Sequence, residues 1–200
     1  MSHEIKAVVF DMDGVLIDAR EWHYEALNRA LALLGYEITR YEHLSTYDGL
    51  PEELHSFMNS LKQQYTLEFV ATRCKPVFQH QYALARLKQA GYKLGVASNS
   101  VRRTVEEMME RSDLLQFLDV IVSNEDVSRG KPDPEMYIKA MASLGVTPDE
   151  TVVVEDNENG IKAATAAGAN VLVVGGPDDV TLQAIQGRIA TAEIERSVAA

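Results

Sequence analysis

The most constraining feature of the sequence is a series of five short apolar runs separated by longer segments with helical periodicity. The runs are rich in valine and occupy residues 5–10, 93–97, 120–122, 152–154 and 171–174. Strands that are apolar on both faces belong in a parallel sheet covered by helices on each side. Helical patterns lie between the runs, at residues 81–90, 101–111, 134–144 and 160–167. The sequence therefore predicts an α/β fold with a doubly wound parallel sheet.

The alternation is interrupted once, between about residues 18 and 79. This segment contains helical patterns but no convincing strand, and about 60 residues is far longer than an ordinary strand-to-helix connection. We therefore expect a small helical domain inserted after the first strand. Active sites of open parallel sheets lie beyond the carboxyl ends of the strands, and the inserted domain is expected to cover that edge. The tail from residue 177 is compatible with a final helix or with a partly frayed end.

Composition limits the classes of partner. The formal net charge of −11 opposes binding to nucleic acid or to an anionic membrane surface. No apolar run approaches the roughly 18 residues that a membrane-spanning helix needs. The first residues do not resemble a secretory signal peptide, and Cys74, the single cysteine, cannot form an intrachain disulfide. A cytoplasmic protein is expected.

The strongest local signal is the pair of carboxylates Asp11 and Asp13, which follow the first predicted strand. A two-residue spacing in an extended chain places both side chains on one face. One carboxylate can then attack an electrophile while the other exchanges protons with the leaving and entering oxygens. The alternative is an ordinary strand-end turn, in which aspartate and a following Gly14 are common.

A second acidic pair, Glu155 and Asp156, follows the fourth predicted strand. The fold brings this pair to the same edge of the sheet as Asp11, and a cluster of carboxylate oxygens suits Mg²⁺. The alternative is a structural one. Asp156, Asn157 or Asn159 would then only cap the helix that follows.

Two further strand ends carry groups suited to phosphate. Ser98 and Asn99 follow the second strand, where a hydroxyl and the next backbone N–H groups can hold phosphate oxygens. Lys131 precedes a predicted helix and offers a compact cation that can neutralise a phosphoryl group. Each signal is weak alone, since a helix cap and a solvated lysine are common. The four signals together supply the parts that phosphoryl transfer requires.

In this order the four motifs resemble those of the haloacid dehalogenase-like phosphohydrolases, in their β-phosphoglucomutase and phosphoglycolate phosphatase branch. The resemblance covers nearly the whole chain and is carried by Asp11-Met12-Asp13-Gly14-Val15, Ser98-Asn99, Lys131-Pro132-Asp133-Pro134 and Glu155-Asp156. It implies a Rossmann-like core, expected at residues 1–17 and 80–200, with an α-helical cap at residues 18–79. It also implies a Mg²⁺-dependent phosphatase that acts on a small phosphorylated metabolite, for example a sugar phosphate.

The resemblance assigns a role to each residue that would act on the phosphoryl group. Asp11 would attack phosphorus and become phosphorylated. Asp13 would protonate the leaving oxygen and later deprotonate the attacking water. Ser98, Asn99 and Lys131 would bind the transferring group.

The same resemblance implies the ligands of the metal. Asp11, the backbone carbonyl of Asp13 and Asp156 would hold Mg²⁺. Glu155 would act from behind these ligands, through a metal-bound water.

Specificity is expected to reside in the inserted domain. His23 corresponds to a histidine of the β-phosphoglucomutases, although a histidine that only packs against its helix neighbours explains it equally well. Arg20 and Arg40 are candidates for substrate contact, against the commoner alternative of solvated arginines. The mutases carry an arginine three residues after a cap glycine, whereas this chain has Gly49 followed by Glu52. A glutamate there would repel a second phosphate, so hydrolysis is predicted ahead of a phosphosugar mutase reaction.

A non-catalytic regulatory or scaffold protein that retains the fold is the alternative from another functional class. Such a protein is expected to have lost Asp11, Asp13, Lys131 or the acidic pair, and all of them are present. The sequence therefore favours an enzyme, and it predicts no oligomeric state.

Overall fold

The computed structural model describes residues 4–37, 39 and 52–199. The chain divides into two compact units. The first consists of Met1–Asp18 together with Lys75–Ala200, and the second of Ala19–Cys74.

The first unit is built on a five-stranded sheet in which every pairing is parallel. Its strands, in sheet order, are β3 (Val120–Val122), β2 (Lys93–Ala97), β1 (Ala7–Phe10), β4 (Thr151–Glu155) and β5 (Asn170–Val173). The chain adds strands first on one side of β1 and then on the other, so the order reverses at β1 and β4. This is the position at which open parallel sheets bind their ligands. The predicted α/β fold with a parallel sheet is confirmed.

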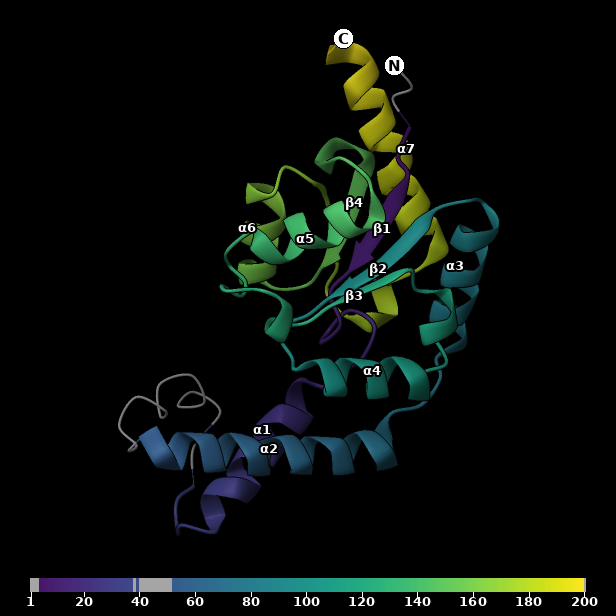
Figure 1. Ribbon diagram of the computed structural model, residues 1–200. Helices are drawn as coiled ribbons and strands as arrows, with labels where there is room; N and C mark the ends of the chain where they lie inside the picture. Colours follow the sequence, from purple (N-terminus) through teal and green to yellow (C-terminus); the bar gives the residue numbers. More distant parts are fainter. Residues whose placement is uncertain (1–3, 38, 40–51, 200) are drawn as a thin grey trace. The chain divides into compact units, whose positions relative to one another are not determined.

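Helices cover both faces of this sheet (Figure 1). One face carries α5 (Glu135–Leu144) and α6 (Glu158–Ala166), and the other carries α3 (Phe78–Gln89) and α7 (Leu182–Ala199). A further helix, α4 (Arg102–Arg111), contacts β3. Short 3₁₀ turns in the described part of the chain occupy Leu115–Phe117, Asn124–Asp126, Pro148–Glu150 and Pro177–Asp179. The segment after residue 177, for which the sequence left two possibilities open, therefore forms a helix over most of its length.

The two central strands are buried along their whole length. Ala7 and Val9 of β1 pack with Val153 of β4, Met136 of α5 and Ala163 of α6. Full burial of a valine side chain is worth about 1.5–3 kcal/mol, so these apolar runs are strongly favoured as central strands. Helices on both sides of the sheet exclude water from both faces of each strand.

The start of α6 shows how a polar residue after a strand sets a helix boundary. The sequence predicts this helix from residue 160, but it begins at Glu158. Asn157 is its N-cap, and its Oδ1 accepts a hydrogen bond of 2.9 Å from the backbone N–H of Gly160. The cap that the sequence offered as an alternative to a site is therefore present, and it is made by Asn157.

The second segment of the first unit begins at Lys75, whereas the sequence-based division placed it at residue 80. Hydrogen bonds also join the first turn of α3 to this unit. Gln79 Nε2 donates to the carbonyl oxygen of Val180 over 3.1 Å, and His80 Nε2 lies 2.8 Å from that of Pro177. These bonds tie the start of α3 to the chain that follows β5.

The second unit is helical and consists, within its described residues, of α1 (Arg20–Ala32) and α2 (Glu52–Arg73). The two helices pack together around the buried residues Leu27, Ala30, Leu31 and Met58. The Arg73 guanidinium donates two hydrogen bonds, of 2.8 and 2.7 Å, to the carboxylate of Glu25. No helix in the described part of the chain has both the length and the apolarity needed to cross a membrane.

Candidate active site

The register of the sheet brings the predicted motifs to one edge. Phe10 of β1 lies opposite Val96 of β2 on one side and opposite Val154 of β4 on the other. The backbone N–H of Asp11 donates to the Val154 carbonyl over 3.0 Å, which extends the ladder by one residue. The residues that follow these three strands, Asp11 among them, therefore emerge beside one another at the carboxyl ends.

A buried lysine joins the first and last of these motifs. Lys131 Nζ lies 2.7 Å from Asp11 Oδ1 and 2.7 Å from Glu155 Oε1. The side chains of Lys131, Asp11 and Glu155 are only 3%, 7% and 0% exposed, respectively. Charges removed from water in this way persist only when they are paired and hydrogen-bonded. The geometry therefore makes these three residues one electrostatic unit.

Glu155 is held by hydrogen bonds at both carboxylate oxygens. Its Oε1 accepts from Lys131 Nζ and from the hydroxyl of Tyr137, and its Oε2 accepts from Asp156 N and Asn157 Nδ2, each over 3.1 Å. These four donors fill the acceptor positions of a carboxylate. Glu155 is consequently fixed in orientation and has little capacity left for another ligand.

Tyr137 is a residue of this site that the sequence analysis did not identify. It lies on α5, is completely buried, and its ring centroid is 4.7 Å from Lys131 Nζ. The ring therefore gives the ammonium a cation–π contact in addition to its two carboxylates. One sequence signal could have identified Tyr137. It is a tyrosine on the apolar face of a predicted helix, and a buried tyrosine hydroxyl needs a hydrogen-bond partner.

Burial and charge shift the pKa values of this group. Burial, together with the negative charges of Glu155 and Asp13, raises the pKa of Asp11 to about 7, against the opposing effect of Lys131. Burial by itself lowers the pKa of Lys131, but attraction to Asp11 and Glu155 outweighs this and leaves the pKa above its ordinary value. Burial and the Glu155 carboxylate hold the pKa of Tyr137 well above its usual range. At neutral pH the lysine is therefore charged and Asp11 is poised between its two protonation states.

Asp13 and Ser98 are linked through Ser100. The side chain of Asp13 is partly buried, and its Oδ2 accepts a hydrogen bond of 3.1 Å from Ser100 Oγ. Ser98 is buried, and its Oγ accepts a hydrogen bond of 3.1 Å from the backbone N–H of Ser100. In the sequence, Ser100 had no role beyond a possible helix cap, because a serine hydroxyl carries no local sign of its distant partner.

The side chain of Asn99 holds the loop that carries Lys131. Its Oδ1 accepts from the backbone N–H of Lys131 over 3.0 Å, and its Nδ2 donates to the Lys131 carbonyl over 3.3 Å. A Cβ on Gly130 would lie 2.7 Å from Asn99 Oδ1, so this approach requires glycine. The backbone N–H of Asn99 has no acceptor among the described residues and remains free to donate to an anion.

The same edge offers oxygen ligands for a cation. Asp11, Glu155 and Asp156 each present a carboxylate oxygen, and these oxygens lie within 4.8 Å of one another. Hard oxygen donors of this kind fit Mg²⁺. Because Glu155 already accepts four hydrogen bonds, Asp11 and Asp156 are the better ligands. Four carboxylates share this edge with one buried ammonium, so a divalent cation would also offset excess negative charge.

The candidate residues of the predicted cap belong to the second unit. Arg20 is the exposed first residue of α1, and His23 is partly buried on the same helix. Arg40 and Gly49 lie outside the described residues, and Glu52 is known only as the first residue of α2.

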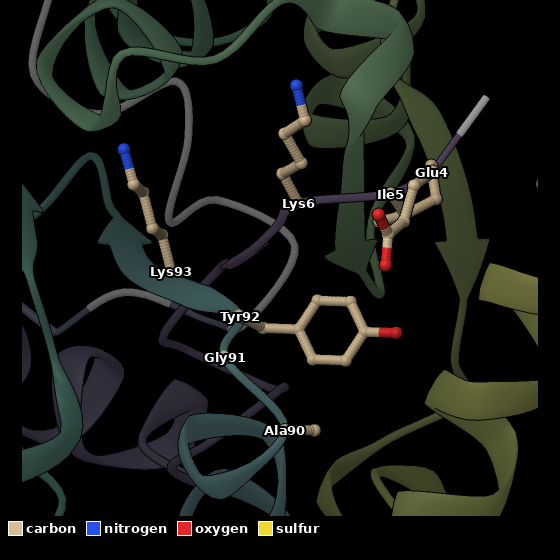
Figure 2. A pocket seen from close by; sticks show the side chains of 7 residues that line it. All are labelled: Glu4, Ile5, Lys6, Ala90, Gly91, Tyr92 and Lys93. Atoms are coloured by element: carbon tan, nitrogen blue, oxygen red, sulfur yellow. The ribbon is translucent and has the colours of Figure 1, made fainter. Parts of the chain in front are cut away.

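A pocket of about 190 Å³ lies at the opposite, amino-terminal edge of the sheet. Figure 2 shows Lys6, Tyr92 and Lys93 among the residues that line it. The Lys6 ammonium is paired with Glu150, and the Lys93 ammonium donates to the carbonyl of residue 144. Both cations of this pocket are therefore already used by the protein, and none of the predicted site residues lines it.

Known proteins resemble this chain over most of its length. A phosphorylated carbohydrates phosphatase of Thermotoga maritima is 35% identical over 178 residues, which cover 82% of each chain. Hexitol phosphatase B of Escherichia coli strain K12 is 30% identical and covers 88% of this chain and 86% of its own. The crystal structure of CbbY from Rhodobacter sphaeroides in complex with phosphate superposes with a TM-score of 0.76 at 26% identity, covering 86% and 87% of the two chains.

A family model agrees with these relatives. The model described as haloacid dehalogenase-like hydrolase matches residues 8–174, which include all four motifs at the carboxyl edge of the sheet. The match thus covers most of the first unit and the whole of the helical insertion. The chain belongs to the haloacid dehalogenase-like hydrolases.

Proposed function

We propose that this protein is a Mg²⁺-dependent phosphatase that hydrolyses a small phosphorylated sugar or sugar alcohol through an aspartyl phosphate on Asp11. The observation that carries the proposal is the buried Lys131 ammonium, 2.7 Å from both Asp11 and Glu155. A fixed cation beside a carboxylate nucleophile lessens its repulsion from an anionic phosphoryl group. Two relatives that are named for an activity, the Thermotoga maritima and Escherichia coli proteins, are phosphatases.

Asp11 is the proposed nucleophile. Lys131 holds its Oδ1, while Oδ2 receives no hydrogen bond from any described residue. One carboxylate oxygen attacks phosphorus in line as the bond from phosphorus to the ester oxygen breaks. The products of this step are an aspartyl phosphate and the leaving group, whose oxygen keeps the bonding electron pair and is protonated as the bond breaks.

Asp13 is the proposed acid and base. In the first step its carboxylic acid gives a proton to the leaving oxygen. In the second step its carboxylate takes a proton from water, whose oxygen attacks phosphorus and releases inorganic phosphate and the Asp11 carboxylate. A positioned acid or base of this kind contributes about 10²–10⁴-fold to a rate.

The transferring phosphoryl group has a set of fixed donors. Ser98 contributes its hydroxyl hydrogen, since its oxygen already accepts from Ser100 N. Lys131 contributes its ammonium. The backbone N–H groups of Met12 and Asn99, which have no acceptor in the described part of the chain, complete the set. Met12 is fully buried, and a buried N–H without a partner is the exception that a bound anion would explain.

The proposed ligands of Mg²⁺ are the carboxylates of Asp11 and Asp156 and the backbone carbonyl of Asp13. Glu155 is proposed to act from behind them, because its hydrogen bonds leave it little room for direct coordination. When bound, the ion supplies charge neutralisation for the phosphoryl oxygens.

Gly14 allows Asp156 to approach the first motif, and this predicts the effect of Gly14→Ala. The φ of Gly14 is 90°, and a Cβ there would lie 2.8 Å from Asp156 Cγ. Gly91 has the same φ of 90° with nothing within 4 Å of its Cβ position, so Gly91→Ala is a matched control. Both variants are expected to lose about 1–2 kcal/mol of stability in urea unfolding.

Only Gly14→Ala is expected to raise the Mg²⁺ concentration for half-maximal activity, by about tenfold or more, because it displaces a ligand. Titration of phosphatase activity with MgCl₂ measures this. An unchanged Mg²⁺ requirement in Gly14→Ala would argue against Asp156 as a ligand.

The proposed substrate class rests on the relatives. The Thermotoga and Escherichia proteins are named for phosphorylated carbohydrates and hexitols, and a mutant of CbbY has been crystallised with xylulose 1,5-bisphosphate. His23 and Arg20 remain proposed substrate contacts of the helical unit. No nucleic-acid or membrane partner is proposed, and the cytoplasm is the proposed compartment because a single cysteine calls for no oxidising environment.

Phosphate release from a panel of sugar and sugar-alcohol phosphates, with and without MgCl₂, tests the proposed function. Phosphate release that requires Mg²⁺ is the expected result, and the phosphate ester that is cleaved fastest identifies the preferred substrate. An isomerised phosphosugar without free phosphate would instead indicate a mutase. If the folded protein forms neither free phosphate nor an isomerised phosphosugar, the result would favour a non-catalytic role.

A further inference from the structure

Ser100 connects two residues of the proposed mechanism. It lies in the loop between β2 and α4, and its hydroxyl donates a hydrogen bond of 3.1 Å to Asp13 Oδ2. Its backbone N–H donates to Ser98 Oγ over 3.1 Å, and its carbonyl accepts from Asn124 N over 3.2 Å. The backbone bonds fix where Ser100 sits, so the hydroxyl is presented to Asp13 from a defined position.

The hydroxyl bond has a consequence for Asp13. Rotation of a carboxylate about its last side-chain torsion is broad and nearly two-fold, so hydrogen bonds to the oxygens decide which oxygen of Asp13 is presented and at what angle. The bond from Ser100 holds Oδ2 as an acceptor. The proton that Asp13 gives to a leaving oxygen is then carried on the other oxygen, Oδ1, and the plane of the carboxyl group is set.

We propose that Ser100 is a positioning residue for proton transfer, which holds the Asp13 carboxyl group so that Oδ1 faces the leaving oxygen. This inference rests on the proposed function, in which Asp13 is the acid. Ser100 thereby contacts two residues of the proposed mechanism: its backbone N–H orients the Ser98 hydroxyl, and its side chain orients the Asp13 carboxylate.

Ser100→Ala isolates the second of these bonds. The substitution removes the hydroxyl, but the backbone bonds to Ser98 and Asn124 remain. The variant should therefore fold and bind substrate normally while delivering a proton poorly. Ser100→Thr restores a hydroxyl at the same position and is the conservative variant. Ser197→Ala, which removes an exposed hydroxyl of α7 that donates only to Ile194, is the matched control.

The dependence on the leaving group distinguishes this role from a structural one. A sugar alkoxide needs a proton in order to leave, whereas p-nitrophenolate does not. We expect Ser100→Ala to slow single-turnover cleavage of the best sugar phosphate of the panel by about 10- to 100-fold, part of what an acid contributes. The p-nitrophenolate burst from p-nitrophenyl phosphate should change by less than about threefold, since the first step then needs no acid. KM should stay near the wild-type value, and Ser100→Thr should recover most of the rate.

Equal losses on both esters, or no loss on the sugar phosphate, would overturn the proposal. Asp13→Asn, measured beside it, separates this failure from a failure of the proposed function. If Asp13→Asn loses the sugar phosphate selectively and Ser100→Ala does not, only the role of Ser100 is wrong. If Asp13→Asn keeps wild-type rates on both esters, the assignment of Asp13 as the acid is wrong.

Discussion

Replacing Asp11 with asparagine is expected to lower kcat for phosphate release by about 10⁴-fold or more, as for other removed nucleophiles. Asparagine cannot form an acyl phosphate that water then cleaves. It does retain an oxygen that accepts from Lys131 Nζ, which lies 2.7 Å from Asp11 Oδ1. The variant should therefore fold with the site intact, and phosphate release in saturating MgCl₂ measures the loss. Equal rates in variant and wild type would show that Asp11 is not the nucleophile.

The same substitution is expected to stabilise the metal-free protein at neutral and alkaline pH. Burial raises the pKa of Asp11 from 3.8 to about 7, so between these values the native protein holds a proton that the unfolded chain has released. The free energy of unfolding therefore falls as the pH rises from about 4 to about 7, by on the order of 4 kcal/mol. Asparagine carries no charge and escapes this loss.

Urea unfolding in EDTA at about pH 5 and about pH 8 measures this effect. The stability advantage of Asp11→Asn should be larger at the higher pH, and adding MgCl₂ should stabilise the wild type more than the variant. Glu110→Gln removes an exposed carboxylate of α4 and is expected to show neither effect. An advantage that does not change with pH would contradict the assigned protonation of Asp11.

Replacing Lys131 with methionine is expected to destabilise the protein by about 3–5 kcal/mol, the usual result of removing one partner of a buried ion pair. Methionine preserves the length and the apolar part of the side chain. The loss of stability therefore arises because the buried carboxylates of Asp11 and Glu155 no longer have a cation beside them. Lys162→Met is the control, because its pair with Glu158 is exposed and such pairs contribute about 1 kcal/mol at most.

A double variant identifies the source of the destabilisation. Adding Asp11→Asn to Lys131→Met removes one of the two uncompensated charges, so part of the lost stability should return. A double-mutant cycle from urea unfolding in EDTA gives the coupling between the two side chains. Additive effects, or wild-type stability in Lys131→Met, would mean that the lysine does not balance the charge of Asp11. Activity should stay lost in the double variant.

Much of the fold was predictable because its signals are local. The valine-rich runs indicate that these strands are buried on both faces. Strands of that kind are found almost only in parallel sheets that are covered by helices. The strand that the sequence predicts at residues 152–154 extends over Thr151–Glu155 because pairing with β1 and β5 adds a residue at each end. Glycines after helices are similarly readable, since Gly145 caps α5 with a φ of 66° that other residues rarely adopt.

The contacts within the site were not predictable in the same way. Ser100 and Asp13 are 87 positions apart in the chain, and Asn99 and Lys131 are 32 positions apart. Neither residue of such a pair carries a local sign of the other. The side-chain amide of Asn99 bonds to the backbone of the lysine loop, a contact that the sequence does not indicate, and its backbone N–H is the group proposed to bind an anion.

The sequence by itself determined the type of fold, the edge of the sheet on which chemistry would gather, and the residue types present there. Those properties depend on short-range patterns of apolar and polar side chains along single strands and helices. Only the tertiary structure decided that Lys131 lies between Asp11 and Glu155 and that Tyr137 completes the partners of Glu155. These contacts depend on the register of three parallel strands and on the packing of α5. The interaction energies that stabilise them arise only when segments distant in the sequence come together in the folded chain.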